Sequence, residues 1–143
     1  MLVKTNGHRQ ILMRTGLPAS GTGKARLGAI SAVDVHPISG RYAVLGTLAG
    51  ASSATNQALW GGNTGAGNDS TQQILREPTL KLRKGQSYSS DQGGGSVRSI
   101  AMRPGADVTG AGGRGLSQVI SSGGAVALTL STDGGVSELV LLP

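Results

Sequence analysis

The chain of 143 residues contains no cysteine and no phenylalanine, and its aromatic residues are Trp60, Tyr42 and Tyr88. Without cysteine, a disulfide framework, a thiolate nucleophile or a zinc–cysteine cluster cannot form. With few aromatic rings, the core depends on Leu, Ile, Val and Ala, whose side chains bury less surface. The 25 glycines also weaken regular structure. We therefore expect an isolated copy to be marginally stable and to gain stability by assembling with others.

Long apolar runs are also absent, whereas a membrane-spanning helix needs about 20 consecutive apolar residues. The N-terminal stretch MLVKTNGHRQILMRTG has no apolar segment followed by a small-residue cleavage pattern, so we expect no signal peptide. These two absences predict a soluble protein that is made in the cytoplasm and has no membrane partner.

Negative charge is scarce: 13 basic residues stand against 7 acidic ones, which gives a net charge of +6. No acidic residue precedes Asp34, and a second basic stretch spans residues 76–103. An excess of positive charge favours acidic surfaces or nucleic acid as partners, and it carries no information about the fold.

Glycine-rich stretches divide the chain into short apolar segments of strand length. We predict strands at residues 10–14, 27–35, 41–48, 79–83, 97–103, 116–121, 125–131 and 136–142. Short strands with frequent turn signals predict an all-β single domain, either a β-sandwich, a jelly-roll-like fold or a barrel with glycine-rich loops. Residues 52–60 fit a loop or a short helix equally well, and residues 61–70 are typical of a flexible surface loop.

Two segments give the strongest strand signals. Apolar and basic residues alternate at 79–84, so a strand there is expected to point Leu80 and Leu82 inward and Lys81 and Arg83 outward. Near the C-terminus, Asp133-Gly134-Gly135 separates two apolar segments and predicts a hairpin whose turn glycines tolerate positive φ.

The segment Ser20-Gly21-Thr22-Gly23-Lys24-Ala25 resembles the end of a phosphate-binding loop. The full pattern requires glycine where Pro18 stands, and a Ser or Thr ligand for Mg²⁺ where Ala25 stands. A flexible basic loop is therefore the better interpretation.

Catalytic and metal-binding patterns are equally weak. Asp34 and His36 lie on one face of a predicted strand and could orient each other, but no serine sits in a G-x-S-x-G elbow. The aspartates are scattered singly beside turn residues, which is typical of turn chemistry. We predict that the protein is not an enzyme, and we assign no catalytic residue, metal ligand or cofactor.

Nucleic-acid binding is the main alternative to a structural role. Lys81, Arg83 and Lys84, with the basic N-terminal third, could contact phosphates in a salt-dependent, sequence-independent way. Single-strand binding normally adds aromatic stacking platforms, for which this chain has few residues. Trp60 fits either a core anchor or an interface anchor.

In size, lack of cysteine, glycine-rich loops, short strands and a basic N-terminal segment, the chain resembles the small decoration or cement proteins of tailed-bacteriophage capsids. This resemblance implies a sandwich, jelly-roll or β-tulip body on the virion surface. It also implies a homodimer or homotrimer that bridges neighbouring subunits of the major capsid protein, or of another virion protein.

The resemblance further implies that residues 1–26 form an extended basic arm along the shell and that residues 27–143 form a single β domain. Removing residues 1–26 should then leave the body folded. The expected partner-binding residues are Lys4, Arg9, Arg14, Lys24, Arg26, Trp60, Lys81 and Arg83. The alternative function is a basic β-barrel that binds nucleic acid without sequence preference.

Overall fold

The computed structural model describes residues 2–5, 8–64, 77–91, 93–102 and 119–143, and it places their side chains from residue 11 onward. Every regular element among these residues is a β-strand, so the all-β prediction is confirmed. The strands are β1 Leu2–Thr5, β2 His8–Ile11, β3 Arg26–Val35, β4 Arg41–Ala49, β5 Gln57–Asn63, β6 Thr79–Arg83, β7 Ser87–Ser90, β8 Gly93–Ala101, β9 Val126–Thr132 and β10 Ser137–Leu142.

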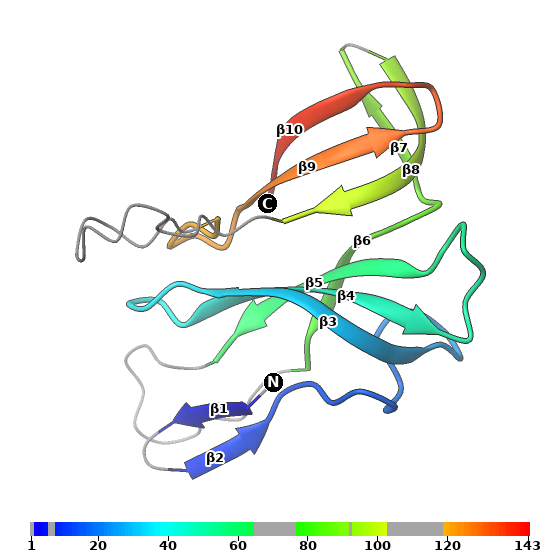
Figure 1. The fold of residues 1–143 in the computed structure, drawn as a ribbon. Helices are drawn as coiled ribbons and strands as arrows, with labels where there is room; N and C mark the ends of the chain where they lie inside the picture. The colour runs from blue at the N-terminus through cyan, green and yellow to red at the C-terminus, as the bar shows by residue number, and fades with distance from the viewer. Residues whose placement is uncertain (1, 6–7, 65–76, 92, 103–118) are drawn as a thin grey trace, which may run out of the picture.

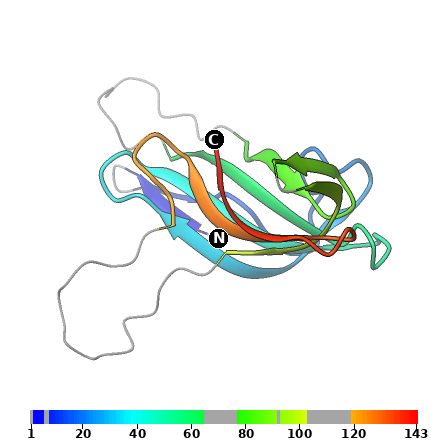
Figure 2. The ribbon, with the colours of Figure 1, turned by 90° about the horizontal axis from the view of Figure 1, so that it is seen from above.

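Eight of the strands form two four-stranded antiparallel sheets, ordered β3-β4-β5-β6 and β10-β9-β8-β7, and β1 pairs with β2. Figures 1 and 2 show the sheet of β7–β10 lying over the sheet of β3–β6, and we call them the upper sheet and the lower sheet. One of the two sheets curves into a half-barrel. Within each four-stranded sheet, strands that are consecutive in the chain are neighbours. The described strands therefore contain none of the Greek-key crossovers that define a jelly roll.

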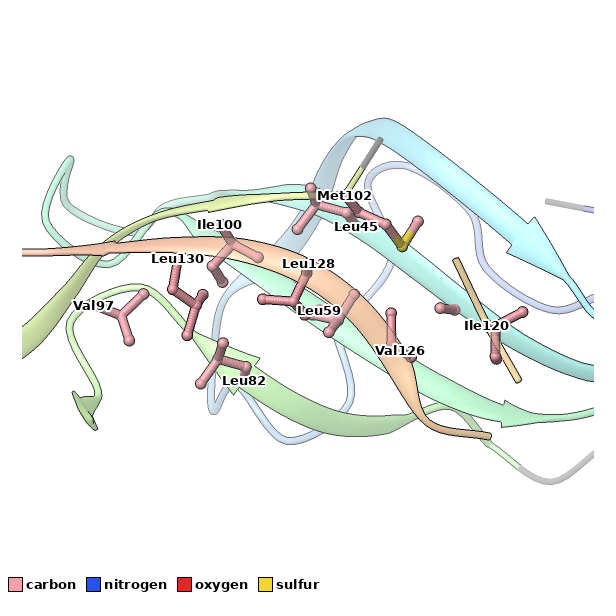
Figure 3. Close-up of a cluster of buried hydrophobic side chains, with 11 residues drawn as sticks. Leu45, Leu59, Leu82, Val97, Ile100, Met102, Ile120, Val126, Leu128 and Leu130 are labelled. Carbon is pink, nitrogen blue, oxygen red and sulfur yellow. The ribbon is translucent and has the colours of Figure 1, made fainter. Parts of the chain in front are cut away.

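The main core lies between the two sheets. Figure 3 shows Leu45, Leu59 and Leu82 of the lower sheet meeting side chains of the upper sheet. The upper sheet and its flanking segments contribute Val97, Ile100, Met102, Ile120, Val126, Leu128 and Leu130. Because these side chains are almost all aliphatic, the core forms without the large rings whose scarcity the composition shows.

A second apolar cluster lies on the opposite face of the β3–β6 sheet, around Tyr42, Val44 and Trp60. Residues 12–25 cover it, and Met13 and Ala19 from this segment are buried there. Part of the segment expected to form an arm is thus packed on the body's own sheet. This cover explains why β4 and β5 have buried residues on both faces, a pattern typical of strands enclosed on both sides.

The prediction that Leu80 and Leu82 face the same core is wrong. Leu80 packs in the outer cluster around Trp60, whereas Leu82 packs in the core between the sheets. The cause is a bulge in β6, because Trp60 pairs with Leu80 while the preceding Leu59 pairs with Leu82. One extra residue in β6 reverses the alternation at this point.

Other expectations differ in part. The end of the 52–60 segment begins strand β5, which continues through residues 61–63, where a flexible loop was expected. Residues 65–70 and 116–118 lie outside the described residues. Of the predicted strand at 116–121, the described part contains an isolated bridge from Ile120 to Val126.

The predicted C-terminal hairpin is confirmed. The backbone N–H of Thr132 donates to the carbonyl of Val136 at 2.9 Å, closing the turn between β9 and β10. Gly135 has a φ of 83°, in the left-handed region where glycine carries no steric penalty. The sequence pattern therefore located this turn correctly.

Candidate interaction surfaces

In the structure, the side chains of Asp34 and His36 accept hydrogen bonds from different backbone segments. The Asp34 carboxylate accepts backbone N–H groups from Val119 and Ile120 at 2.7 and 3.0 Å. His36 instead accepts from the Ser39 N–H through Nδ1 at 3.2 Å, within the turn after β3. Both side chains therefore hold backbone N–H groups in place. The Asp34 carboxylate links β3 to the segment that leads into β9. Among the described residues, no group of three or more His, Cys, Asp or Glu could hold a metal ion.

The glycine loop that resembles a phosphate-binding loop is a closed turn. Thr22 Oγ1 donates to the Ala19 carbonyl at 2.7 Å, and Ala19 N–H donates to the Ala25 carbonyl at 3.1 Å. The loop leads into strand β3 rather than into a helix, so it lacks the helix N-terminus on which phosphate loops depend.

The basic residues expected to contact a partner lie on several different elements. Arg14, Lys24 and Arg26 are exposed along the segment that covers the outer cluster, and Arg26 Nη1 donates to the Gly16 carbonyl at 2.8 Å. Lys81 lies at one end of the sheets, where its Nζ donates to the Pro143 carbonyl at 3.1 Å.

Arg83 is half-buried and its Nε donates to the Thr55 carbonyl at 3.1 Å. Lys4 and Arg9 are opposite each other in the β1–β2 register. Two of the five predicted cations from Arg14 onward, Arg26 and Arg83, thus stabilise loops through their guanidinium groups. The charge pattern of the sequence alone could not reveal this.

The three aromatic residues are turned toward the protein itself. Trp60 is 0% exposed and its Nε1 donates to the Ser20 carbonyl at 2.9 Å. In this conformation Trp60 is a core anchor and offers no surface to a partner. Tyr42 is also buried, which raises its pKa to about 12. Tyr88 donates its hydroxyl to Glu138 Oε2 at 3.0 Å. Trp60 and Tyr42 therefore expose no ring on which a base could stack, and Tyr88 is half-buried.

An exposed apolar surface lies on the outside of strands β8–β10. On the edge strand β10, Leu139 and Leu141 point outward and are 80% and 70% exposed. Their alternates Val140 and Leu142 pack on the core. The strand pairing places only small, uncharged side chains beside these leucines. We call this surface the neutral face: Ser99, Ala101, Ala127, Thr129, Ser131, Ser137, Leu139 and Leu141.

The neutral face has one described charged neighbour along β8, the exposed Arg98 at the bulge before Ser99. Sequence reasoning missed this surface, because the run Leu139–Leu142 is apolar throughout and does not reveal which residues point outward. An assignment that pointed the charged Glu138 to solvent would have turned Leu139 and Leu141 inward, whereas Glu138 lies on the inner side and accepts the Tyr88 hydroxyl.

The described residues also line clefts on the surface. One, of about 370 Å³, lies between residues 12–23 and Glu77-Pro78. Another, of about 250 Å³, lies at one end of both sheets, and both Arg41 and Lys81 line it. Within the described part of the chain, no helix has the length and apolarity of a membrane span. No protein-family model, curated protein or solved structure matches the chain.

Proposed function

We propose that this chain is a structural virion protein that binds and stabilises a capsid lattice, as decoration or cement proteins do, and that its copies associate through the neutral face. The observation that carries the proposal is the pair of outward leucines on the edge strand β10. Soluble monomers usually protect edge strands with lysine, proline or inward charges. Strand β10 carries one inward charge, Glu138, whose carboxylate accepts hydrogen bonds from Tyr88 and Ser90. Its outward positions, Ser137, Leu139 and Leu141, carry neither lysine nor proline.

A second copy of the chain is the occupant that the charges favour. Two copies that each carry +6 repel one another when basic surfaces meet. The neutral face is an uncharged surface on which two copies can meet without placing like charges opposite each other. Each leucine that becomes fully buried there contributes roughly 1.5–3 kcal/mol.

Assembly on a shell would follow from mass action. A protein that binds the mature lattice, and binds the disrupted lattice less well, stabilises the mature form in proportion to its binding free energy. The resemblance in size and composition to decoration proteins supports a capsid as the lattice. The structural role requires no catalytic group, and the Asp34 and His36 side chains already serve the fold.

The double variant Leu139→Ser/Leu141→Ser tests the proposal. Its matched control is Ile38→Ser, which changes an 82% exposed side chain in the turn after β3. We expect light scattering to show a dimer or trimer for the wild type and the control, and a monomer for the double variant. Co-sedimentation with the particles of the corresponding virus should weaken in parallel. A wild-type chain that is monomeric and does not sediment with particles would overturn the proposal.

The alternative, a basic protein that binds nucleic acid non-specifically, is favoured by the exposed cations Arg14 and Lys24. The burial of Trp60 and Tyr42 argues against base stacking. Elution from DNA–cellulose against salt distinguishes the two functions. Steep salt-dependent binding by a monomer supports the alternative, and an oligomer that ignores DNA supports the structural role.

A further inference from the structure

The 250 Å³ cleft at the end of the two sheets, which we call the end cleft, combines positive charge with exposed backbone. Strands β4–β6 contribute Arg41, Lys81 and the Gly61-Gly62 pair, and the segments that flank β9 and β10 contribute Gly123-Gly124 and Pro143. The volume is below the roughly 300–1,000 Å³ of sites for drug-sized ligands. The end cleft therefore suits one side chain or a small ion.

Glycines leave the space that the side chains of Arg41 and Lys81 occupy. A Cβ atom at Gly124 would lie 2.8 Å from Arg41 Cδ and 3.1 Å from its Nη1. A Cβ atom at Gly61 would lie 3.3 Å from Lys81 Cε. Each cation thus rests against a glycine of a neighbouring segment. This packing limits the positions that the two side chains adopt before any ligand arrives.

One of the two cations in the end cleft has no partner among the described residues. Lys81 Nζ already donates to an oxygen of Pro143, the last residue of the printed sequence, at 3.1 Å. Arg41 makes no ion pair or side-chain hydrogen bond within the described ranges, and Glu77, which lines the same cleft and is exposed, forms no ion pair there with either cation. The guanidinium group of Arg41 is therefore the main hydrogen-bond donor that the end cleft offers to a ligand.

We propose that the end cleft binds a carboxylate side chain from an acidic segment of the protein to which this chain docks. A guanidinium group recognises a carboxylate through two parallel hydrogen bonds, and a nearby ammonium group adds a point charge. The inference rests on the proposed function, because it specifies which chemical group of the lattice protein this chain would bind. The neutral face would join copies to each other, and the end cleft would join them to the lattice.

The test compares two double variants with the same change in net charge. Arg41→Gln/Lys81→Gln alters the end cleft, and Arg14→Gln/Lys24→Gln alters two exposed cations elsewhere; each lowers the net charge from +6 to +4. The probes are a glutamate-rich peptide, acetate and inorganic phosphate. Binding is followed by calorimetry and by the NMR amide shifts of Gly61 and Gly124.

We expect the peptide and acetate to shift these two amides, and the cleft variant to weaken peptide binding at least about tenfold. The control variant should change it less than about twofold. Equal weakening by both variants would show a general charge effect and overturn the inference. So would preferential binding of phosphate, or shifts confined to other residues.

The inference and the proposed function fail separately. If the cleft variant decorates particles as the wild type does, while Leu139→Ser/Leu141→Ser does not, the carboxylate site is wrong and the structural role stands. If the wild type binds acidic peptide through the end cleft but neither oligomerises nor decorates particles, the proposed function is wrong and the site stands.

Discussion

The two sheets differ in how their outer faces are covered. The outer face of β3–β6 carries Tyr42, Val44 and Trp60, and the chain's own residues 12–25 bury them. The outer face of β8–β10 carries Leu139 and Leu141, which remain largely exposed. Both faces carry leucines, and among the described residues the segment 12–25 packs on only one of them. This segment stabilises the fold on one side and leaves Leu139 and Leu141 exposed on the other.

The N-terminal segment packs on the body more closely than an extended arm would. The resemblance implies that residues 1–26 could be removed without loss of the fold. The structure places Met13 and Ala19 over the outer cluster and joins the Ser20 carbonyl to Trp60. Residues 12–25 thus cover the body, and they can serve a partner only with the surfaces that remain exposed, such as Arg14 and Lys24.

Removal of residues 1–25 is expected to have the largest effect on the covered face. It would expose the indole of Trp60 and its apolar neighbours to water, so we expect loss of cooperative unfolding in urea and a red-shifted tryptophan emission. Trp60 is the only tryptophan, so the emission reports this site alone. Removal of residues 1–10 is the control and should leave the emission unchanged. A sharp transition and an unshifted spectrum after removal of 1–25 would show that the cover is dispensable.

The same substitution on the two outer faces gives a smaller but more direct comparison. Leu27 is 2% exposed in the covered cluster, whereas Leu139 is 80% exposed on the neutral face. We expect Leu27→Ala to lower the free energy of unfolding by about 2–5 kcal/mol. Leu139→Ala should change it by less than about 0.5 kcal/mol in dilute solution. Urea titration below the association concentration measures both, and equal costs would show that the neutral face is buried within a single copy.

The sequence predicted strands where turn residues bound a clear apolar segment, including β4, which is buried on both faces. The segment 136–142 and the turn at Asp133-Gly134-Gly135 were located correctly because the turn chemistry is local. Strand β5 was missed because Ala58, Leu59 and Trp60 are all buried, so no alternation marks them. A pattern with a period of two residues requires one solvent-exposed face, and β5 has none.

The candidate sites were less accessible to sequence reasoning. Arg41, Lys81 and Gly124 meet in the end cleft only after both sheets have formed, so no local motif announces them. The bulge in β6 likewise depends on its partner strand, and it separates Leu80 from Leu82. The total positive charge was visible from composition, but Arg26 and Arg83 bind carbonyls of the chain itself.

The smallest expected effect concerns the hydroxyl of Tyr42 beneath the covered face. This group is buried without a hydrogen-bond partner among the described residues, and burial raises its pKa from 10.0 to about 12. Below pH 10 the phenol is neutral in both states. Between these two pKa values the unfolded chain loses the proton while the folded chain keeps it, so stability falls as the pH rises through this window.

Tyr42→Phe removes both the titration and the unpartnered hydroxyl. We expect the variant to be at least as stable as the wild type at neutral pH, because an unsatisfied buried polar group costs about 1–3 kcal/mol. The difference in unfolding free energy between the two proteins should then grow in favour of the variant between about pH 10 and 12. Taking this difference cancels the contribution of every titrating group that both proteins share. A difference that stays constant across the window would show that water reaches the Tyr42 hydroxyl, and the cover of residues 12–25 would then be looser than that of the core between the sheets.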